Sequence, residues 1–443
     1  FQTYATRFVS PSFGFAMGWN YWFNWAITVA AELVAAGIVM AYWLPGVPSW
    51  IWAALFLTLL TTLNALSARA FGEGEFWLSA IKVVTVIVFL IAGVAMIAGI
   101  VGGMVGIALT ELMHFIQHTA YGYGTGGGHV SFREGVVQTS SERRVLVLIL
   151  CGVVVGFGWW SLKRFGRPQI EIKTALKQPL QGLPFLTTVS HALLQIITVG
   201  LGSPLGREVA PREMTAAFAS VGGRRLGLDE DEMRLLLACA SGAGLAAVYN
   251  VPLASTLFIL EAMLGIWTQQ AVAAALLTSV TATAVARIGL GDVQQYHPAH
   301  LDVNIPLLWF AAAIGPVLGA TAVWFQRSAK KFPFLKRNDP KIIPLAVVLF
   351  ALIGIVSVWF PEILGNGKAG NQLTFGGMTD WRYSLEMTAV KWFVVLLALA
   401  AGAYGGLITP SMMLGSTIAF AAAAAWNTFF PAMSSESAAV IGA

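Results

Sequence analysis

Glu208 is the residue whose chemical type and position most clearly predict a role. It lies in Gly202-Ser203-Pro204-Leu205-Gly206-Arg207-Glu208-Val209-Ala210-Pro211, a segment between two apolar stretches. Small residues allow a sharp turn there, and Pro211 can open a following helix. A helix N-terminus presents unpaired N–H groups and the positive end of its dipole, so it can bind an anion without a full positive charge. A carboxylate beside it would compete with the anion and yield when protonated, so we predict that Glu208 is a gate.

A related pattern follows about 200 residues later, and two such breaks in separate halves of a membrane protein indicate a central site between inverted repeats. The second segment reads Gly402-Ala403-Tyr404-Gly405-Gly406-Leu407-Ile408-Thr409-Pro410. It again places a glycine-rich turn before a proline that can start a helix. We therefore expect the two breaks to meet near the middle of the membrane, with Glu208 close to Leu407 and Ile408.

The composition indicates which elements position these segments. Of 443 residues, 57% are hydrophobic and only 11% are charged, against about 25% charged in an average soluble domain. The mean hydropathy of +0.74 excludes a soluble enzyme. The 26 basic and 21 acidic residues are spread thinly between apolar runs, which excludes a nucleic-acid partner. We predict an all-α, polytopic membrane protein embedded in a lipid bilayer, in a bacterial inner (plasma) membrane.

The apolar runs differ in length, and several are interrupted by Gly or Pro. About 20 residues cross a bilayer, whereas shorter runs suggest buried or re-entrant segments. The runs cover 14–42, 49–67, 77–101, 104–118, 144–162, 184–201, 211–221, 233–248, 252–267, 271–289, 305–325, 342–359, 388–403 and 411–430. This pattern predicts tilted and broken helices, which belong to proteins that place helix ends inside the membrane.

Basic loops predict the orientation. Segment 327–341 holds six Lys or Arg residues and one acid, and further basic stretches occur at 163–177 and at Arg224-Arg225. By the positive-inside rule these segments lie on the cytoplasmic side.

Other patterns carry little functional weight. Gly126-Gly127-Gly128 lacks the Lys-Ser/Thr of a phosphate loop and is interpreted as a flexible loop. His114 and His118 have the spacing of a metal pair, but no nearby acid or Cys completes a site, which favours a satisfied polar pair. Cys151 and Cys239 support neither a disulfide framework nor a metal cage. Gly-x-Ser-x-Gly and Walker patterns are absent, so we expect no enzymatic chemistry, no metal and no cofactor.

Residues 1–95 carry a dense set of motifs that resembles the amino acid permease family in its third to fifth membrane helices. The motifs are Gly14-Phe15-Ala16-Met17-Gly18-Trp19-Asn20-Tyr21-Trp22, Glu32-Leu33, Tyr42-Trp43-Leu44-Pro45, Asn64, Phe71-Gly72-Glu73-Gly74-Glu75-Phe76-Trp77 and Ile81-Lys82-Val83. In that family the substrate binds unwound parts of the first and sixth helices, which are not in this block. Glu73, Glu75 and Lys82 flank a span, where charges sit at the interface. Glu32 is the one acid expected to be buried, for packing, a local hydrogen bond or a functional role.

Residues 104–443 resemble the CLC family of chloride channels and chloride/proton exchangers. Four motifs in order carry this resemblance: Gly206-Arg207-Glu208 with Pro211, Tyr249-Asn250-Val251-Pro252-Leu253-Ala254, Pro361-Glu362-Ile363-Leu364-Gly365-Asn366-Gly367-Lys368, and Gly406-Leu407-Ile408-Thr409-Pro410. The resemblance implies a CLC-type inverted-repeat fold, with Glu208 as the external gating glutamate. Gly206 would belong to the anion site, Arg207 would be a structural or electrostatic neighbour, and the N–H groups of Leu407 and Ile408 would face the anion.

The sequence departs from the CLC pattern at several positions. Phe165 stands where the family has a Ser that contacts the anion, and it offers no donor. Val209-Ala210 replaces the glycine expected after Glu208. Glu261 is followed by Ala262 where the exchangers carry a second, inner acid, so we expect anion movement without tight coupling to protons.

The two resemblances predict the domain organisation. Residues 1–95 form a permease-like transmembrane fragment, 96–103 a junction, and 104–443 a CLC-type domain. Members of the CLC family continue through three more membrane helices, with an anion-contacting tyrosine and part of a homodimer interface, so by this comparison the chain is incomplete at its C-terminus.

Three functions are consistent with the sequence. The first is transport of chloride or a similar small anion through a CLC-type pore gated by a glutamate. The second is secondary transport of amino acids, resting on residues 1–95. The third is a non-functional chimera of two truncated membrane proteins.

Overall fold

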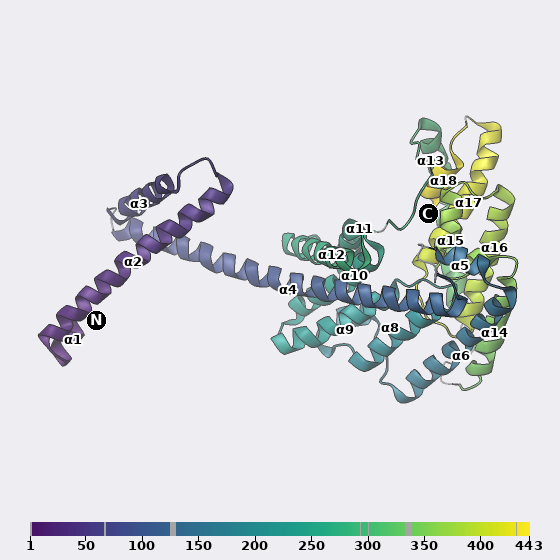
Figure 1. The fold of residues 1–443 in the computed structure, drawn as a ribbon, viewed down its shortest axis with the longest axis horizontal. Coiled ribbons are helices and arrows are strands. Elements are labelled where there is room, and N and C mark those ends of the chain that lie inside the picture. The colour runs from purple at the N-terminus through teal and green to yellow at the C-terminus, as the bar shows by residue number, and fades with distance from the viewer. Residues whose placement is uncertain are drawn as a thin grey trace. The chain divides into compact units, whose positions relative to one another are not determined.

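The computed structural model describes residues 2–65, 68–124, 130–292, 294–299, 301–332, 339–430 and 432–443, without the side chains of 63, 64 and 66–92. The loop Gly126–Gly128 and the side chains of Glu73, Glu75 and Lys82 therefore lie outside the described residues. Every secondary-structure element in the described ranges is a helix, which confirms the predicted all-α class. The chain divides into two compact units, Phe1–Leu90 and Ile91–Ala443 (Figure 1).

The first unit contains α1 (Gln2–Phe8), α2 (Pro11–Trp43), α3 (Ser49–Ala65) and the first part of α4 (Ala68–Tyr121). The Ser10 hydroxyl caps α2 by accepting from the backbone N–H of Phe13. Only 6% of the most apolar window of α2 is buried, as expected for a helix that faces lipid. Glu32 is exposed on α2, so the prediction that it is buried was wrong.

The second unit contains the remaining elements, and Figure 1 labels most of them. They are α4 from Gly93, α5 (Phe132–Gln138), α6 (Ser141–Phe165), α7 (Ile172–Lys177), η1 (Pro179–Gln181), α8 (Phe185–Gly200), α9 (Val209–Leu226), α10 (Glu230–Tyr249), α11 (Pro252–Phe258), η2 (Ile259–Leu264), α12 (Gln269–Leu290), α13 (Ile305–Lys331), α14 (Ile342–Val356), η3 (Pro361–Ile363), α15 (Lys368–Phe375), α16 (Trp381–Ala400), α17 (Ile408–Phe429) and α18 (Ser435–Gly442). Across the described residues, 8 helices are long and apolar enough to cross a membrane.

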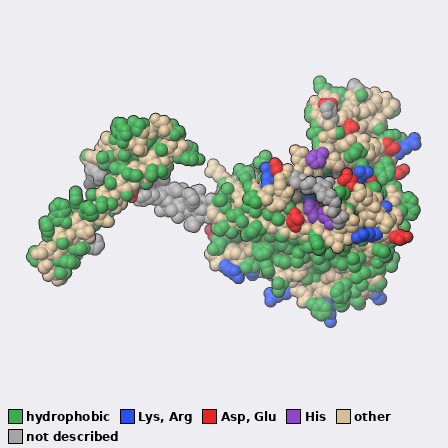
Figure 2. Space-filling model, in the orientation of Figure 1, with side chains coloured by type: hydrophobic (Ala, Val, Ile, Leu, Met, Phe, Trp, Pro, Cys, Tyr) green, Lys and Arg blue, Asp and Glu red, His purple; other side chains and the backbone are tan. Residues whose placement is uncertain are grey.

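The apolar surface of the second unit fits a lipid environment. Figure 2 shows hydrophobic side chains over much of its visible face, with several Lys and Arg side chains along the lower margin. On α6, the exposed apolar residues recur every three or four positions and so follow one face of the helix. They are Leu146, Leu150, Val153 and Phe157.

One predicted break does not exist. The runs 77–101 and 104–118 were separated at Gly102 and Gly103, but α4 continues through both glycines. A Cβ added at Gly102 would lie 2.7 Å from Cβ of Ala243, and one at Gly103 would lie 2.7 Å from Cγ1 of Val285. These glycines therefore let α10 and α12 approach α4 closely, which is the use of small residues between membrane helices, and they do not turn the chain.

The two glycine-rich breaks share one backbone design. After α8, Gly202 has φ +98° and its N–H donates to the Val199 carbonyl at 3.0 Å; after α16, Gly402 has φ +85° and donates to the Leu399 carbonyl, also at 3.0 Å. Positive φ at both positions favours glycine. Each following helix begins two residues before its proline, not at it as predicted. Proline is tolerated at the third position because the first four N–H groups of a helix have no partner within it.

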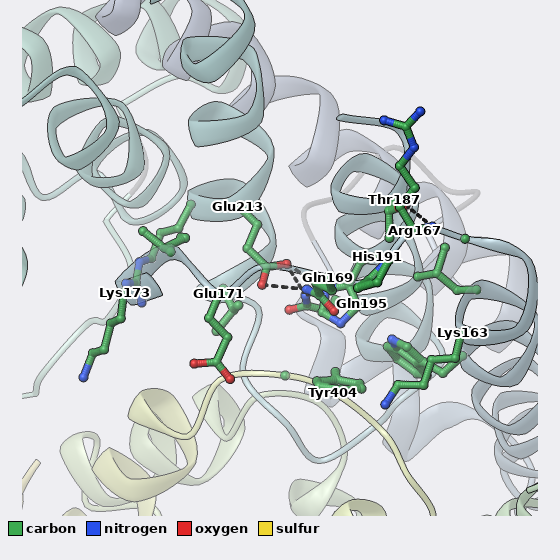
Figure 3. Close-up of a pocket in the computed structure, with 18 residues that line it drawn as sticks. Lys163, Arg167, Gln169, Glu171, Lys173, Thr187, His191, Gln195, Glu213 and Tyr404 are labelled. Atoms are coloured by element: carbon green, nitrogen blue, oxygen red, sulfur yellow. Dashed lines mark hydrogen bonds and ion pairs between the residues drawn. The ribbon is translucent and has the colours of Figure 1, made fainter. Parts of the chain in front are cut away.

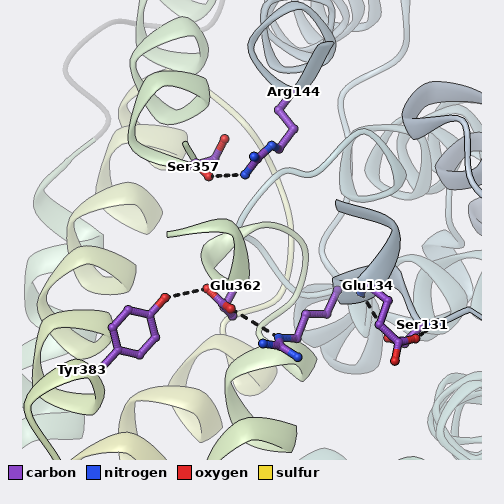
Figure 4. A network of polar contacts seen from close by, with 7 residues as sticks. Ser131, Glu134, Arg144, Ser357, Glu362 and Tyr383 are labelled. Atoms are coloured by element: carbon purple, nitrogen blue, oxygen red, sulfur yellow. Dashed lines mark hydrogen bonds and ion pairs between the residues drawn. The ribbon is translucent and has the colours of Figure 1, made fainter. Parts of the chain in front are cut away.

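A polar network supports the first break. Figure 4 shows Glu362 on η3 accepting from the Tyr383 hydroxyl at 2.8 Å, and Nε of Arg133 on α5 donates to the same carboxylate at 3.3 Å. The fully buried Lys391 donates to the carbonyls of Ile363 and Gly365, at 2.8 Å each. The Gly365 N–H in turn donates to the carbonyl of Gly202 at 3.1 Å. The segment after α14 is thus anchored to α5 and α16 and contacts the turn that precedes α9.

Candidate functional site

The two breaks meet at a pair of glycines. The Gly206 N–H donates to the Gly406 carbonyl at 2.7 Å, and the Gly406 N–H donates to the Gly206 carbonyl at 2.9 Å, as an isolated antiparallel bridge. This confirms the prediction that the segments 202–211 and 402–410 come together. The bridge brings the starts of α9 and α17 side by side.

Glu208 precedes α9 and is only 1% exposed. Its Oε1 accepts from the backbone N–H groups of Ile408 at 2.8 Å and Thr409 at 3.2 Å. Its Oε2 accepts from the Thr409 hydroxyl at 2.9 Å and from the Tyr249 hydroxyl at 3.3 Å. The carboxylate therefore occupies the N-terminus of α17, where unpaired N–H groups and the helix dipole favour negative charge.

Glycine leaves room for this carboxylate on both sides. A Cβ added at either Gly206 or Gly406 would overlap the carboxyl group of Glu208. The close approach of two backbones around one side chain explains why both segments carry glycine at these positions.

Arg207 lies next to Glu208 without pairing with it. Its guanidinium lies 5.3 Å from the ring centroid of Tyr249, and Nη1 lies 3.7 Å from the Met113 sulfur. In the described parts of the chain, no ion pair joins Glu208 to Arg207 or Arg212. The geometry therefore does not favour the alternative interpretation of Glu208 as one half of a simple salt bridge.

The predicted anion-site residues occupy different places. Gly206 forms the backbone bridge with Gly406, and Ile408 donates its N–H to the Glu208 carboxylate. Leu407 directly precedes α17 and packs against the main apolar core. Phe165, the last residue of α6, is 79% exposed and packs edge-on against Trp160.

Glu261 and Ala262 are exposed on η2. They take no part in the contacts of the Glu208 carboxylate.

The sequence analysis missed two of the groups that hold Glu208. Thr409 and Tyr249 were quoted only as members of longer motifs. Thr409 could have been predicted as a donor to Glu208. It lies in the first turn of the helix whose N–H groups bind the carboxylate, and its hydroxyl lies on the same side as those groups. Tyr249 gave no such indication, since its position depends on how α10 packs.

A pocket of about 590 Å³ reaches the start of α9, next to Glu208 (Figure 3). Val209 and Gly405, the sequence neighbours of Glu208 and Gly406, belong to its lining. The lining also includes Lys163, Arg167 and Lys173, which come from a predicted cytoplasmic stretch. The pocket therefore lies between a basic stretch of the chain and the backbone next to Glu208.

A buried polar cluster lines the same pocket, and Figure 3 shows its four members grouped together. Nδ1 of His191 on α8 lies 2.7 Å from Oε2 of Glu213 on α9. Gln195 donates its amide N–H to Oε2 of Glu213 at 2.9 Å, and Gln169 donates to Oε1 at 3.2 Å. The sequence analysis did not identify this cluster, because its members come from three separate elements.

Two family models match this chain, and their boundaries agree only partly with those of the two compact units. Residues 146–443 match the family model described as voltage gated chloride channel, and residues 1–124 match the amino acid permease model. The permease match thus extends beyond Ile91, where the second compact unit begins.

The fold is similar to solved CLC-type structures. A slow cyanobacterial Cl⁻/H⁺ antiporter aligns with a TM-score of 0.65 and 20% identity, over 77% of this chain and 80% of that one. A CLC-type fluoride/proton antiporter aligns with a TM-score of 0.58 and 20% identity, over 80% of this chain and 84% of that one.

Two curated relatives are lysine-specific permeases, and each aligns with less than a third of this chain. The lysine-specific permease LysP of Escherichia coli (strain K12) is 58% identical over 103 residues, which is 23% of this chain and 21% of the permease. LysP of Lactococcus lactis subsp. cremoris (strain MG1363) is 49% identical over 130 residues, 29% of this chain and 26% of the permease. The chain thus spans about a quarter or less of these relatives.

Proposed function

The chain belongs to the voltage gated chloride channel family, and we propose that its residues 104–443 move chloride or a similar small anion across a membrane through a pore gated by Glu208. One observation carries the proposal. The carboxylate of Glu208 accepts four hydrogen bonds at the start of α17, from two backbone N–H groups and two hydroxyls. These donors are the kind that bind a small anion at a helix N-terminus.

The gate works by competition for those donors. Deprotonated Glu208 occupies them and blocks the anion path. Protonation removes its charge and weakens its hold on the N–H groups of Ile408 and Thr409, so an anion can take its place. Anion flux should therefore rise as the external pH falls.

The experiment is chloride flux from liposomes that contain the full chain, measured over a range of external pH. Glu208→Gln mimics the protonated gate, so its flux should be high at neutral pH and independent of pH. Glu386→Gln, an exposed acid on α16, is the matched control and should keep the wild-type pH response. If Glu208→Gln also kept that response, the gate assignment would be wrong.

The transported anion is proposed from the relatives. The two aligned structures are described as a chloride/proton and a fluoride/proton antiporter, so the same liposome assay should compare chloride with fluoride. The family resemblance also implies a homodimer, which mass photometry of the detergent-solubilised protein tests.

The permease-like part of the chain suggests a second candidate function: residues 1–124 match the amino acid permease model, and the chain is 58% identical to a lysine-specific permease over 103 residues. We propose instead that residues 1–95 pack as a few helices outside the conduction unit. Deleting 1–95 should leave the Glu208-dependent chloride flux unchanged, and the intact chain should not take up lysine. Loss of chloride flux at normal expression would contradict the first expectation, and lysine uptake the second. The genomic reading frame around 96–103 tests whether two genes were joined.

A further inference from the structure

We infer that His191 and Glu213 form a proton-binding site beside the inner pocket, and that this site exchanges protons with Glu208 and links proton movement to anion movement. The inference rests on the proposed role of Glu208 as the gate. It assigns a function to a buried cluster that the gate itself does not use.

The geometry of the pair requires a shared proton. His191 is 1% exposed and Glu213 is 7% exposed, and Nδ1 lies 2.7 Å from Oε2. An N–O distance this short needs a proton between the two atoms. Gln195 and Gln169 donate to the carboxylate, and their amide nitrogens also lie 2.8 Å and 2.9 Å from Nδ1. The pair therefore shares one proton between Nδ1 and Oε2.

The second nitrogen of the ring is the place for an additional proton. Nε2 of His191 is buried and has no hydrogen-bond partner among the described residues. The ring itself lies edge-to-face against Tyr404, with centroids 4.7 Å apart, and near Trp159. Protonation at Nε2 gives an imidazolium whose charge is balanced by the adjacent carboxylate of Glu213. The pair can thus alternate between a net charge of minus one and zero.

The charged groups around the pocket link this protonation to an anion. Besides His191 and Glu213, the pocket lining holds six titratable or charged side chains. They are Lys163 on α6, Arg167 and Glu171 before α7, Lys173 on α7, Arg212 on α9 and Tyr404 before α17. The cations among them outnumber the acids, so the pocket is a favourable place for an anion. An anion in the pocket offsets these cations and favours proton uptake. Anion entry and proton uptake therefore assist each other.

The pocket leads from the pair to the residue next to the gate. Glu208 directly precedes α9 and Glu213 lies five residues later, about 7.5 Å along a helix axis, and Val209, the residue after Glu208, lines the same pocket as Glu213. A volume of about 590 Å³ can hold several waters, each occupying about 30 Å³ in the liquid. In the transfer, Nε2 of His191 releases its proton through this water, and a carboxylate oxygen of Glu208 accepts it. The pair returns to a charge of minus one and Glu208 becomes neutral.

This site changes the expectation drawn from Ala262. Weak coupling was predicted because the inner acid of the exchangers is replaced there. His191 and Glu213 lie on α8 and α9 instead of η2, and they supply titratable groups on the pocket side of the gate.

The test uses liposomes containing the full chain, with a chloride gradient and a pH-sensitive dye inside. The wild-type protein should move protons against their gradient when chloride flows. Glu213→Gln and His191→Gln should each reduce chloride-driven proton movement by about tenfold or more, because they remove a proton-transfer group. Chloride flux should fall much less than this, so the number of protons moved per chloride drops. Glu213→Asp should restore proton movement. Glu386→Gln, an exposed acid on α16 outside the pocket lining, is the control and should change neither.

The outcomes separate this inference from the proposed function. Glu208-dependent chloride flux without proton movement in the wild-type protein would overturn the inference and leave the gate intact. Proton movement that persists in Glu213→Gln would also overturn it. Absence of Glu208-dependent chloride flux would contradict the proposed function itself.

A calorimetric measurement covers the case in which Glu213→Gln does not fold. In the Glu208→Gln background the gate cannot titrate, so any proton taken up on chloride binding must go elsewhere. The heat of chloride binding should then depend on the ionisation enthalpy of the buffer. A binding heat that is the same in all buffers would overturn the inference.

Discussion

The carboxylate of Glu208 and the backbone N–H of Ile408 lie 200 residues apart in the sequence and form a hydrogen bond of 2.8 Å. The contact joins the starts of two helices that follow the same kind of turn, with positive φ at Gly202 and at Gly402. One helix start supplies the acid, and the other supplies three of its four donors, with Tyr249 at the end of α10 supplying the fourth. Because two of the four donors are backbone N–H groups, the clearest tests alter the space around the carboxylate or the two hydroxyls.

Gly406→Ala should open the gate without removing the acid. The added Cβ would overlap the Glu208 carboxyl group, so the side chain must leave the N–H groups of Ile408 and Thr409. Each hydrogen bond lost is worth about 1 kcal/mol or more, and chloride flux at neutral pH should rise about fivefold and lose most of its pH dependence.

The control for Gly406→Ala is Gly222→Ala on α9. A Cβ at Gly222 would meet nothing within 4 Å, so its flux and pH response should match the wild type. An unchanged pH response in Gly406→Ala would mean that the Glu208 carboxylate does not block the anion path when it is bound to the N–H groups of Ile408 and Thr409.

Thr409→Val should shift the pH response without abolishing it. The substitution removes the hydroxyl that donates to Oε2 of Glu208 at 2.9 Å and keeps the backbone donors. A hydrogen bond to a charged group contributes about 1.5 kcal/mol, so the charged form becomes less stable and Glu208 is protonated more easily. The midpoint of the flux-against-pH curve should move upward by about one pH unit.

Thr417→Val is the matched control, since this buried Thr lies further along α17 and bonds to the Met413 carbonyl. It should leave the midpoint in place. A downward shift in Thr409→Val would show that the hydroxyl serves the anion more than the gate.

The sequence predicted the centre of the site more reliably than its surroundings. Glu208 and Ile408 follow from local rules, because a glycine-rich turn and a helix start are encoded within a few residues. Tyr249, His191 and Glu213 were missed because their roles depend on helices that pack together from different parts of the chain.

Two wrong predictions have similar causes. Gly102 and Gly103 were interpreted as a break, although glycine also serves close helix packing, and only the neighbours Ala243 and Val285 distinguish the two uses. Glu32 was expected to be buried because its helix is apolar, but the hydropathy of a membrane helix does not say which side chains contact protein.

Lys391→Met should destabilise the segment that supports the first break. The buried ammonium group donates to the carbonyls of Ile363 and Gly365. Methionine removes the cost of burying a charge but leaves two carbonyls unpaired, and we expect a net loss of about 1–3 kcal/mol. The thermal unfolding midpoint of the detergent-solubilised protein should fall by several degrees, whereas the exposed Lys341→Met should not change it. An equal midpoint in both variants would mean that the two carbonyls find other partners.

The last prediction concerns α5, a short helix outside the predicted spans. Ser131 donates its backbone N–H to Glu134 at 2.8 Å and its hydroxyl at 2.9 Å, and the Glu134 N–H donates back to that hydroxyl. The two hydrogen bonds from Ser131 lower the pKa of Glu134 below its usual value of 4.5. A depressed pKa means that the carboxylate stabilises α5 at neutral pH, and that this stabilisation is lost as the pH falls below 4.5 through the folded value.

Amide hydrogen exchange of α5, corrected for intrinsic rates, measures this effect. Protection in the wild-type protein should fall about twofold to fivefold between neutral pH and a pH below the folded pKa of Glu134, a modest change because the carboxylate is well solvated. Glu134→Ala should show the lower protection at every pH, since it has no carboxylate to titrate. Glu142→Ala, in the first turn of α6, should behave as the wild type. Arg133 on α5 also forms an ion pair with Glu362. Protection of α5 that does not change with pH in the wild-type protein would mean that this ion pair, and not the cap, stabilises the helix.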